Sequence, residues 1–280
     1  MGKMINIEDM KKLEFNMLKF LREICVKNNL RFYIIGGTLL GAVRHRGFIP
    51  WDDDIDVVMP REDFEKVVEI MNNSSQSRYK LFSVSNKEDY IYTFGKLIDT
   101  NTCLRENIKH NVSGLGIYLD IFPIDGLPDN TVLRKLHYFK IYILKKLLYL
   151  TYYSNFKSEN IMKKTIKKIL LSFADKLGER KLINSIIKIA KKYRYDNCDS
   201  IGVITAGYGI KEIMPKEIYK ETVYLEFEGE KFPAPWKYKE YLTRIYGNYM
   251  ELPPEEDRVT HHNYEVYWKD DEENDKENKK

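Results

Sequence analysis

Cysteine is scarce in this chain of 280 residues, and long hydrophobic runs are missing. The three cysteines, Cys25, Cys103 and Cys198, stand too far apart to indicate a disulfide framework or a zinc site. No stretch of about 18 apolar residues is present, so we expect no transmembrane helix. The N-terminal residues MGKMINIEDMKKLEF also lack the apolar core of a signal peptide. These absences favour a protein of the reducing cytoplasm.

Positive charge is concentrated in one segment. The whole chain has a net charge of +4, but residues 131–195 hold 17 lysines and arginines against 3 acidic residues. Lysine pairs alternate there with leucine, isoleucine and tyrosine, which is typical of basic amphipathic helices that lie on anionic membrane surfaces. The alternative is a helical subdomain with a solvated lysine-rich face. We expect no nucleic-acid partner, because no nucleic-acid-binding motif accompanies these residues.

Helix and strand patterns alternate in the first 130 residues. Asn6 is placed to cap a helix that ends near Asn28, and a strand over FYII then leads into Gly36 and Gly37. A short helix with Thr38 as its N-cap follows. Later segments read as a strand over DIDVVMP, a helix over REDFEKVVEIMNN, and strands at residues 79–84, 92–99 and 116–122. This order predicts an α+β fold in which helices flank a mixed sheet.

The string WDDDID at residues 51–56 places four carboxylates just before an apolar strand. Residues i and i+2 of a strand point to the same side, so Asp54 and Asp56 aim their carboxylates at one place. Like charges held together need a counter-charge, and oxygen ligands suit Mg²⁺ or Mn²⁺. Asp53 is expected to support these ligands or to cap the loop. Solvated acids at an exposed strand end, or a stabilising calcium ion, are the alternatives.

A third acid is expected on a later strand. Asp120 in GIYLDIF stands between Leu119 and Ile121, and an aspartate buried in this way needs a partner or a metal. Asp125 competes for the role, but PIDGLP reads as a turn, where aspartate has an ordinary structural function. Upstream, the GG turn opens a helix whose first N–H groups are able to hold a phosphate, with a plain turn as the alternative.

A GG turn, a D-x-D about twenty residues later and an acid on a later strand together resemble the nucleotidyltransferase fold. The longer string GGTLLGAVRHRGFIPWDDDIDVVMPREDFEKV, with GKLID, YLDIFPIDG and FPAPWKYKEYLTRIYGNYMELPPEE, resembles the LicD family. The resemblance spans roughly residues 9 to 268. This family includes bacterial phosphocholine transferases and is related to fukutin-type polyol-phosphate transferases. The zinc-binding insert of the fukutin-related proteins has no counterpart among the dispersed cysteines.

The resemblance implies a metal-dependent phosphotransferase. Such an enzyme moves phosphocholine, or a related phospho-alcohol, from CDP-choline or another CDP-alcohol to a sugar hydroxyl of a cell-surface or lipid-linked glycan, and CMP leaves. Asp54 and Asp56 match the family's D-x-D and would hold Mg²⁺ or Mn²⁺. Asp120 matches the later acid, as a third ligand or as the base that takes the sugar proton. The lipid carriers of such glycans lie at the cytoplasmic leaflet, so the protein is expected in the cytoplasm, with peripheral contact to the inner face of the membrane.

Cations and aromatic rings complete the expected site. Arg44 and Lys96 are candidates for contact with the donor phosphates, because charge-assisted contacts suit a diphosphate. Trp51 lies beside the acids and is a candidate wall for a quaternary ammonium group, which aromatic faces attract. Weaker candidates are His45, Arg105 and Trp236. The substrate-binding residues that we predict are Gly36, Gly37, Thr38, Arg44, Lys96 and Trp51.

Four segments are expected along the chain. Residues 1–130 would form a nucleotidyltransferase-like catalytic core with an N-terminal helix, and residues 131–200 a basic helical subdomain. Residues 201–268, with a helix from Tyr238 to Tyr246, would complete the active site. Residues 269–280 would form a disordered tail. Two rival functions remain open: a nucleotidyltransferase that transfers an NMP group, and a non-catalytic membrane-associated scaffold with a relict fold.

Overall fold

A computed structural model describes residues 2–74, 77–106, 112–152, 161–260 and 264–269, without the side chains of Glu106 and of residues 161–167. The expected tail at 269–280 therefore lies outside the described residues, apart from Lys269. The α-helices are α1 (Ile7–Lys27), α2 (Gly36–Arg44), α3 (Arg61–Asn72), α4 (Thr131–Tyr152), α5 (Ile161–Leu177), α6 (Glu179–Ala190) and α7 (Tyr238–Tyr246). The strands are β1 (Tyr33–Ile34), β2 (Asp56–Pro60), β3 (Tyr79–Phe82), β4 (Gly95–Asp99), β5 (Thr102–Glu106), β6 (Tyr118–Leu127), β7 (Ser200–Gly202), β8 (Met214–Pro215), β9 (Thr222–Phe227), β10 (Glu230–Pro235) and β11 (Tyr264–Trp268).

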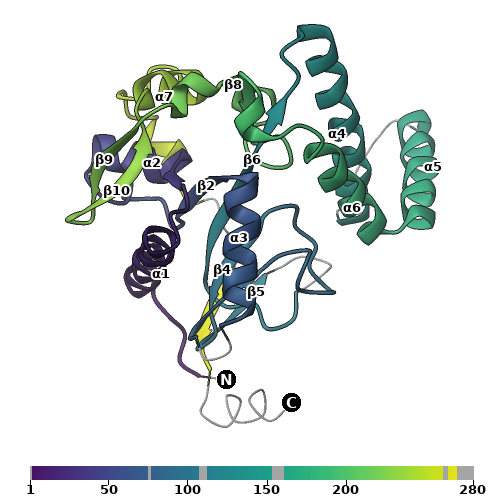
Figure 1. Cartoon of the computed structure of the whole chain (residues 1–280). Helices are drawn as coiled ribbons and strands as arrows, with labels where there is room; N and C mark the ends of the chain where they lie inside the picture. The colour runs from purple at the N-terminus through teal and green to yellow at the C-terminus, as the bar shows by residue number, and fades with distance from the viewer. Residues whose placement is uncertain (1, 75–76, 107–111, 153–160, 261–263, 270–280) are drawn as a thin grey trace.

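A seven-stranded mixed sheet forms the centre of the molecule (Figure 1). Its main path is β1-β2-β6-β4-β3, and β7 and β8 continue it from the far end of β6. The β2–β6 pair is parallel, whereas β4 and β7 run antiparallel to β6. Two ribbons, β9-β10 and β5-β11, stand outside this sheet. The mixed α+β fold expected from the sequence is confirmed.

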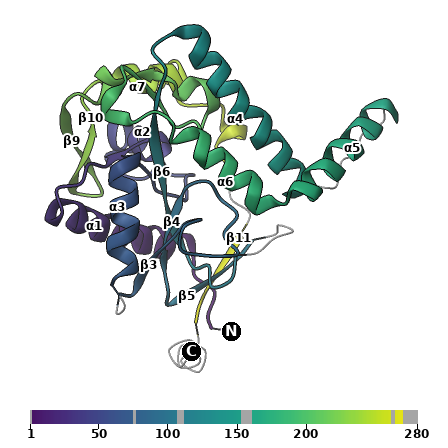
Figure 2. The ribbon, with the colours of Figure 1, turned by 45° about the vertical axis from the view of Figure 1, so that its right-hand side comes forward.

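Strand β6 is the central element, because it pairs with β2, β4 and β7. Leu119, Ile121 and Leu127 are fully buried, as expected for a strand covered on both faces. Alternate residues of a strand point to opposite faces, so Asp120 and Asp125 leave β6 on opposite sides. Helices α1 and α3 pack on the sheet from opposite sides, as the two views in Figures 1 and 2 show.

Asp125 lies inside strand β6, and the expectation that it sits in a turn was wrong. Proline is tolerated here because Pro123 and Pro128 flank the residues that pair with β7. The Asp125 carboxylate is completely buried and accepts two hydrogen bonds of 2.7 Å from Arg61, the first residue of α3. This bidentate pair anchors α3 on the sheet. The structural role expected for Asp125 therefore holds, although its surroundings differ.

Helix α1 begins where its cap predicts. The backbone N–H of Asp9 donates to the Asn6 side chain at 2.9 Å, and the apolar residues Met17, Leu18 and Leu21 are buried beneath the helix. Helix α2, in contrast, starts two residues before the expected cap. Thr38 is already inside it, and its hydroxyl accepts the N–H of Asp56 at 2.8 Å. The prediction of Thr38 as an N-cap was wrong because the glycine pair forms the first turn of the helix itself.

The C-terminal strand β11 was not recognised in the sequence. It pairs antiparallel with β5, and the N–H groups of Gly2 and Ile5 donate to its carbonyls at Trp268 and Val266. This pairing joins residues more than 150 positions apart, which no local pattern reveals. Both ends of the described chain therefore lie together at one edge of the molecule (Figure 1).

The basic segment forms α4, α5 and α6, in agreement with the helical reading of residues 131–195. These helices contact one another and stand beside the sheet (Figure 2). Among the described residues, no helix combines the length and the hydropathy that crossing a bilayer requires.

We expect Asp125→Asn to lower the free energy of unfolding by about 3–5 kcal/mol, because it leaves the buried guanidinium of Arg61 without its counter-charge. Urea unfolding at neutral pH measures this loss. Asp196→Asn is the matched control: Asp196 also binds an arginine, Arg31, but is about half exposed, so its loss should cost about 1 kcal/mol or less. Equal losses in the two variants would contradict the anchoring role of the buried pair.

Candidate active site

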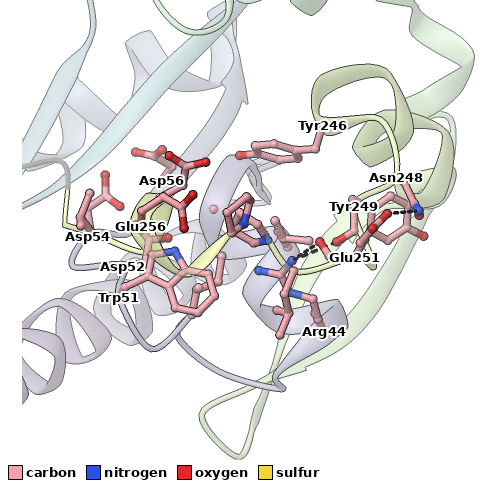
Figure 3. Close-up of a pocket in the computed structure, with 18 of the residues that line it drawn as sticks. Arg44, Trp51, Asp52, Asp54, Asp56, Tyr246, Asn248, Tyr249, Glu251 and Glu256 are labelled. Atoms are coloured by element: carbon pink, nitrogen blue, oxygen red, sulfur yellow. Dashed lines mark hydrogen bonds between the residues drawn. The ribbon is translucent and has the colours of Figure 1, made fainter.

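A cavity of about 880 Å³ opens between α2, the acidic loop before β2 and the segment that follows α7. Figure 3 shows the carboxylates of Asp52, Asp54 and Asp56 on one side of this cavity, with Arg44 and Glu251 across from them. Asp54 and Asp56 therefore face one space, as the i, i+2 spacing predicts. Asp52 joins them, although the sequence analysis gave it no role.

The register of the strands places Asp120 and Lys96 beside Asp56. Asp56 lies directly across from Asp120 in the parallel β2–β6 pair, and Asp120 lies across from Lys96 in the antiparallel β6–β4 pair. The three residues thus form one row over neighbouring strands. Asp120 and Lys96 are close to the predicted D-x-D, but neither is among the residues that line the cavity.

Lys96 is almost completely buried and its ammonium group binds Asp120. Its Nζ atom donates to the two carboxylate oxygens of Asp120 at 2.8 and 3.2 Å. The same atom lies 3.2 Å from the ring centroid of Tyr118, and Tyr92 and Phe94 complete an aromatic surround at 4.7 and 5.3 Å. This arrangement holds Asp120 in place. A direct contact between Lys96 and a donor phosphate stays a prediction.

Negative charge is concentrated at this wall of the cavity. Carboxylate oxygens of Asp52, Asp53 and Asp54 lie within 4.8 Å of one another, close enough to share a cation. Burial raises the pKa of Asp56 well above its ordinary value, and the charges of Asp54, Asp120 and Asp52 raise it further, while Lys96 acts in the opposite direction. Oxygen donors clustered in this way suit Mg²⁺ or Mn²⁺. The residues present therefore fit the divalent cation that the sequence suggested.

Glu14 of α1 is a sixth carboxyl group at this place, and the sequence analysis missed it. It is completely buried, and neither of its oxygens has a hydrogen-bond partner among the described residues. Burial raises the pKa of Glu14 well above its ordinary value, and Asp54 and Asp53 are the next causes, which places this carboxyl group beside the acidic loop. One signal was available: Glu14 interrupts the apolar stripe of α1, four residues after Met10 and three before Met17.

The first turn of α2 lies against the acids. Gly36 has a φ of +57°, and a Cβ atom at Gly37 would come within 2.3 Å of the Asp52 carboxylate. A side chain at Gly37 would displace the Asp52 carboxylate, and the left-handed backbone at Gly36 favours glycine there. The positive end of the helix dipole then faces the acidic loop and offsets part of its charge. Phosphate binding by these N–H groups stays a prediction.

Arg44, at the end of α2, reaches the cavity from the opposite side. Its Nη1 atom donates to the carbonyl oxygens of Tyr249 and Glu251 at 3.1 and 3.4 Å. The guanidinium groups of Arg44 and Arg258 lie 5.9 and 5.6 Å from the ring centroid of Trp51. Trp51 is thus an aromatic surface that already attracts cations of the protein itself.

Tyrosines from the C-terminal third close the cavity. The hydroxyl groups of Tyr208 and Tyr246 share a hydrogen bond of 2.7 Å, and the Tyr246 hydroxyl lies near Gly36. Burial raises the pKa of Tyr208 to about 12, so this hydroxyl stays protonated. The remaining lining comes from residues 248–259, among them Tyr249 and Glu256. Tyr246 and Tyr249 lie in the string FPAPWKYKEYLTRIYGNYMELPPEE, which carries part of the family resemblance, whereas Tyr208 lies outside every string that does.

The three weaker candidates are not among the residues that line the cavity. The indole N–H of Trp236 donates to the carbonyl oxygen of Glu217, and Trp236 is not among the residues that line the cavity. Arg105 lies on β5, with its guanidinium group 5.8 Å from the ring centroid of Tyr267. His45 caps the C-terminal end of α2 behind Arg44, where burial lowers its pKa.

The raised pKa of Glu14 predicts a pH dependence of stability. Because the folded state binds this proton more tightly than the unfolded state, the stabilising contribution is present below the ordinary pKa of 4.5 and is lost as the pH rises above it. Without metal at neutral pH, Glu14→Gln should therefore be more stable than the wild type, by an excess that shrinks towards pH 4.5. Urea unfolding with a chelator, followed over pH, measures the difference. A constant difference would argue against a buried, unpaired carboxyl group.

Comparison with known proteins identifies the family. The model described as "LicD/FKTN/FKRP, nucleotidyltransferase domain" matches residues 29–164, which include the GG turn, the acidic loop, Lys96 and Asp120. The lipopolysaccharide cholinephosphotransferase LicD of Haemophilus influenzae is 32% identical over 272 residues, covering 95% of this chain and 99% of that protein. An uncharacterized protein of Rickettsia prowazekii is 35% identical over 135 residues, which cover 47% of this chain and 45% of the relative. The expected resemblance is confirmed: the chain belongs to the LicD family.

Proposed function

We propose that this protein is a transferase that moves phosphocholine, or a related phospho-alcohol, from a CDP-alcohol to a sugar hydroxyl of a glycan and releases CMP. One observation carries the proposal. The row Asp56-Asp120-Lys96 stands behind an acidic cavity wall in a chain that aligns over nearly its whole length with a lipopolysaccharide cholinephosphotransferase. The cavity, at about 880 Å³, has room for a nucleotide diphosphate ester.

The acids would bind the donor through a divalent cation. Asp52, Asp54 and Asp56 face the cavity and would hold Mg²⁺ or Mn²⁺, with Asp53 and Asp120 beside them. When bound, the cation supplies positive charge against the diphosphate of the donor. Arg44 stands across the cavity, where its guanidinium group would contact the phosphate that leaves with CMP. The protonated hydroxyls of Tyr208 and Tyr246 would donate to phosphate oxygens.

The transfer itself is an in-line displacement at phosphorus. The acceptor oxygen bonds to the phosphorus that carries the alcohol, the bond from this phosphorus to the bridging oxygen breaks, and the electron pair leaves with CMP. The hydroxyl proton passes to a carboxylate. Asp120 is our candidate, because its position beside Asp56 is fixed by Lys96. The alternative role of Asp120, as a further cation ligand, depends on the same fixed position.

A panel of CDP-alcohols tests the proposed reaction. The protein is incubated with Mg²⁺, one of CDP-choline, CDP-ethanolamine, CDP-ribitol or CDP-glycerol, and a glycan acceptor, and the products are identified by mass spectrometry. We expect CMP and an acceptor that gains the phospho-alcohol. Pyrophosphate with a nucleotidylated acceptor would support the rival nucleotidyltransferase instead. The absence of both turnover and cation binding would support a non-catalytic scaffold.

The acceptor that we propose is carried on lipid at the inner face of the cytoplasmic membrane. Support comes from the relative, whose name specifies lipopolysaccharide, and from the positive charge of residues 131–195. The protein would then work in the cytoplasm and contact an anionic membrane surface peripherally.

We expect Asp56→Asn, and separately Asp54→Asn, to reduce turnover by at least about 100-fold, because each removes a proposed cation ligand. The fold should be retained, since each change removes repulsion among the acids. CMP release measures activity, and isothermal titration with Mn²⁺ measures cation binding. Asp199→Asn, an acid remote from the cavity lining, is the control. Retention of more than about a tenth of the activity by both variants would contradict the assignment.

Arg44→Ala should lower kcat/KM for the CDP-alcohol while cation binding stays nearly unchanged. Charge-assisted contacts to phosphate contribute roughly 1.5–3 kcal/mol, so a loss of about 10-fold or more is expected. Steady-state kinetics with varied donor concentration measure it. Arg46→Ala, which removes an exposed arginine two residues away, is the matched control. A change of less than about threefold in Arg44→Ala would make this side chain an ordinary structural arginine.

A further inference from the structure

Helix α4 turns a row of large apolar side chains towards solvent. Val132, Leu136, Phe139 and Ile143 are 65%, 52%, 55% and 42% exposed. Their spacing of four, three and four residues puts them on one face of the helix. The opposite face is ordinary core, because Ile141 and Leu148 are buried where α4 packs against α5 and α6. The apolar row, which we call the α4 row, is therefore not the face that folding uses.

Exposed hydrophobic side chains are concentrated on this part of the molecule. Nineteen large hydrophobic residues are exposed within the described chain, and ten of them lie on α4 and α5. Those on α5 are Ile169, Leu170 and Phe173. Scattered exposed residues need no explanation, but the four side chains of the α4 row share one helix face, and such a patch marks a binding surface.

Positive charge borders the α4 row. Lys135, Lys140 and Lys146 fall beside it on the helix, and α4 contains no acidic residue. A second copy of the chain would meet this surface with the same positive charge, which opposes self-association. An anionic lipid surface offers both an apolar interior and negative headgroups, and it matches apolar residues flanked by lysine.

The same surface continues towards the active site. A groove of about 490 Å³ runs between α4 and the segment after Tyr208, and its lining includes Tyr138, Phe139 and Ile210. Ile210 is 60% exposed, and Tyr208, two residues earlier, lines the acidic cavity. A bilayer that contacts Phe139 and Ile210 would thus lie near the segment that contributes Tyr208 to the acidic cavity.

We propose that the α4 row docks the protein on an anionic lipid bilayer. Val132, Leu136, Phe139 and Ile143 enter the headgroup region, and the bordering lysines contact lipid phosphates. Docking of this kind needs no membrane-spanning helix. The orientation towards a lipid-linked acceptor rests on the proposed function, but binding to the bilayer does not, so the two are measured separately.

Co-sedimentation of the intact protein with vesicles tests the proposal. Vesicles of phosphatidylglycerol and phosphatidylcholine are compared with vesicles of phosphatidylcholine alone. We expect binding to the anionic vesicles only, weakening as salt rises, because the Debye length shrinks to a few ångströms at high ionic strength. The triple variant L136S/F139S/I143S should bind the anionic vesicles at least about tenfold more weakly than the wild type. The charge variant K135Q/K140Q/K146Q should lose most of the salt-sensitive binding.

Matched controls separate docking from a general loss of hydrophobic surface. V26S/Y224S removes two exposed apolar side chains from α1 and β9 and should bind vesicles like the wild type. In the variant F139W, the fluorescence emission of the added tryptophan should shift to the blue when anionic vesicles are added. In the variant Y224W, the emission should not shift. The triple serine variant should still release CMP with a soluble acceptor, whereas failure of the wild type in that assay would count against the proposed function alone.

Three results would overturn the docking proposal. The first is equal binding of the wild type and the triple serine variant to anionic vesicles. The second is no binding of the wild type to either kind of vesicle. The third is that sedimentation velocity without lipid finds the wild type as a dimer and the triple serine variant as a monomer. The α4 row would then join two copies of the chain.

Discussion

Repulsion among clustered carboxylates is the constraint around which this molecule is organised. The parallel pairing of β2 with β6 sets Asp56 beside Asp120, and the loop before β2 adds Asp52, Asp53 and Asp54. A sheet interior would exclude such a group of acids, since like charges at close range raise one another's free energy where water is scarce. The surrounding elements have to offset this charge.

Three devices offset the charge without removing it. The ammonium group of Lys96 donates a hydrogen bond to Asp120, and aromatic rings shield that pair from water. The N-terminal end of α2 faces Asp52 and Asp56, which is possible only because Gly36 and Gly37 have no side chains to obstruct the approach. Burial and the neighbouring acids raise the pKa of Glu14, which favours its uncharged form and so limits the negative charge at this place. Asp52, Asp54 and Asp56 still line the cavity.

How much of this was predictable depends on the range of each interaction. The Asn6 cap and the facing pair Asp54 and Asp56 follow from local spacing, and both were predicted from the sequence. The bond between Lys96 and Asp120 depends on the register of two strands 24 residues apart, which the sequence does not state. Glu14 offered a weak signal as a charged residue within an apolar stripe. Tyr208 offered none, since its position depends on how the C-terminal third folds back over α2.

The pairing of β11 with β5 has a consequence for synthesis of the protein. Residues 264–268 complete a ribbon whose other strand was made about 160 residues earlier, and the half-buried Tyr264 lies near Glu14 and Asp53. A nascent chain on the ribosome therefore carries its acids for most of translation without this cover. Contacts of such long range form late and slow folding. The acids thus gain this neighbour only after residue 264 has been made.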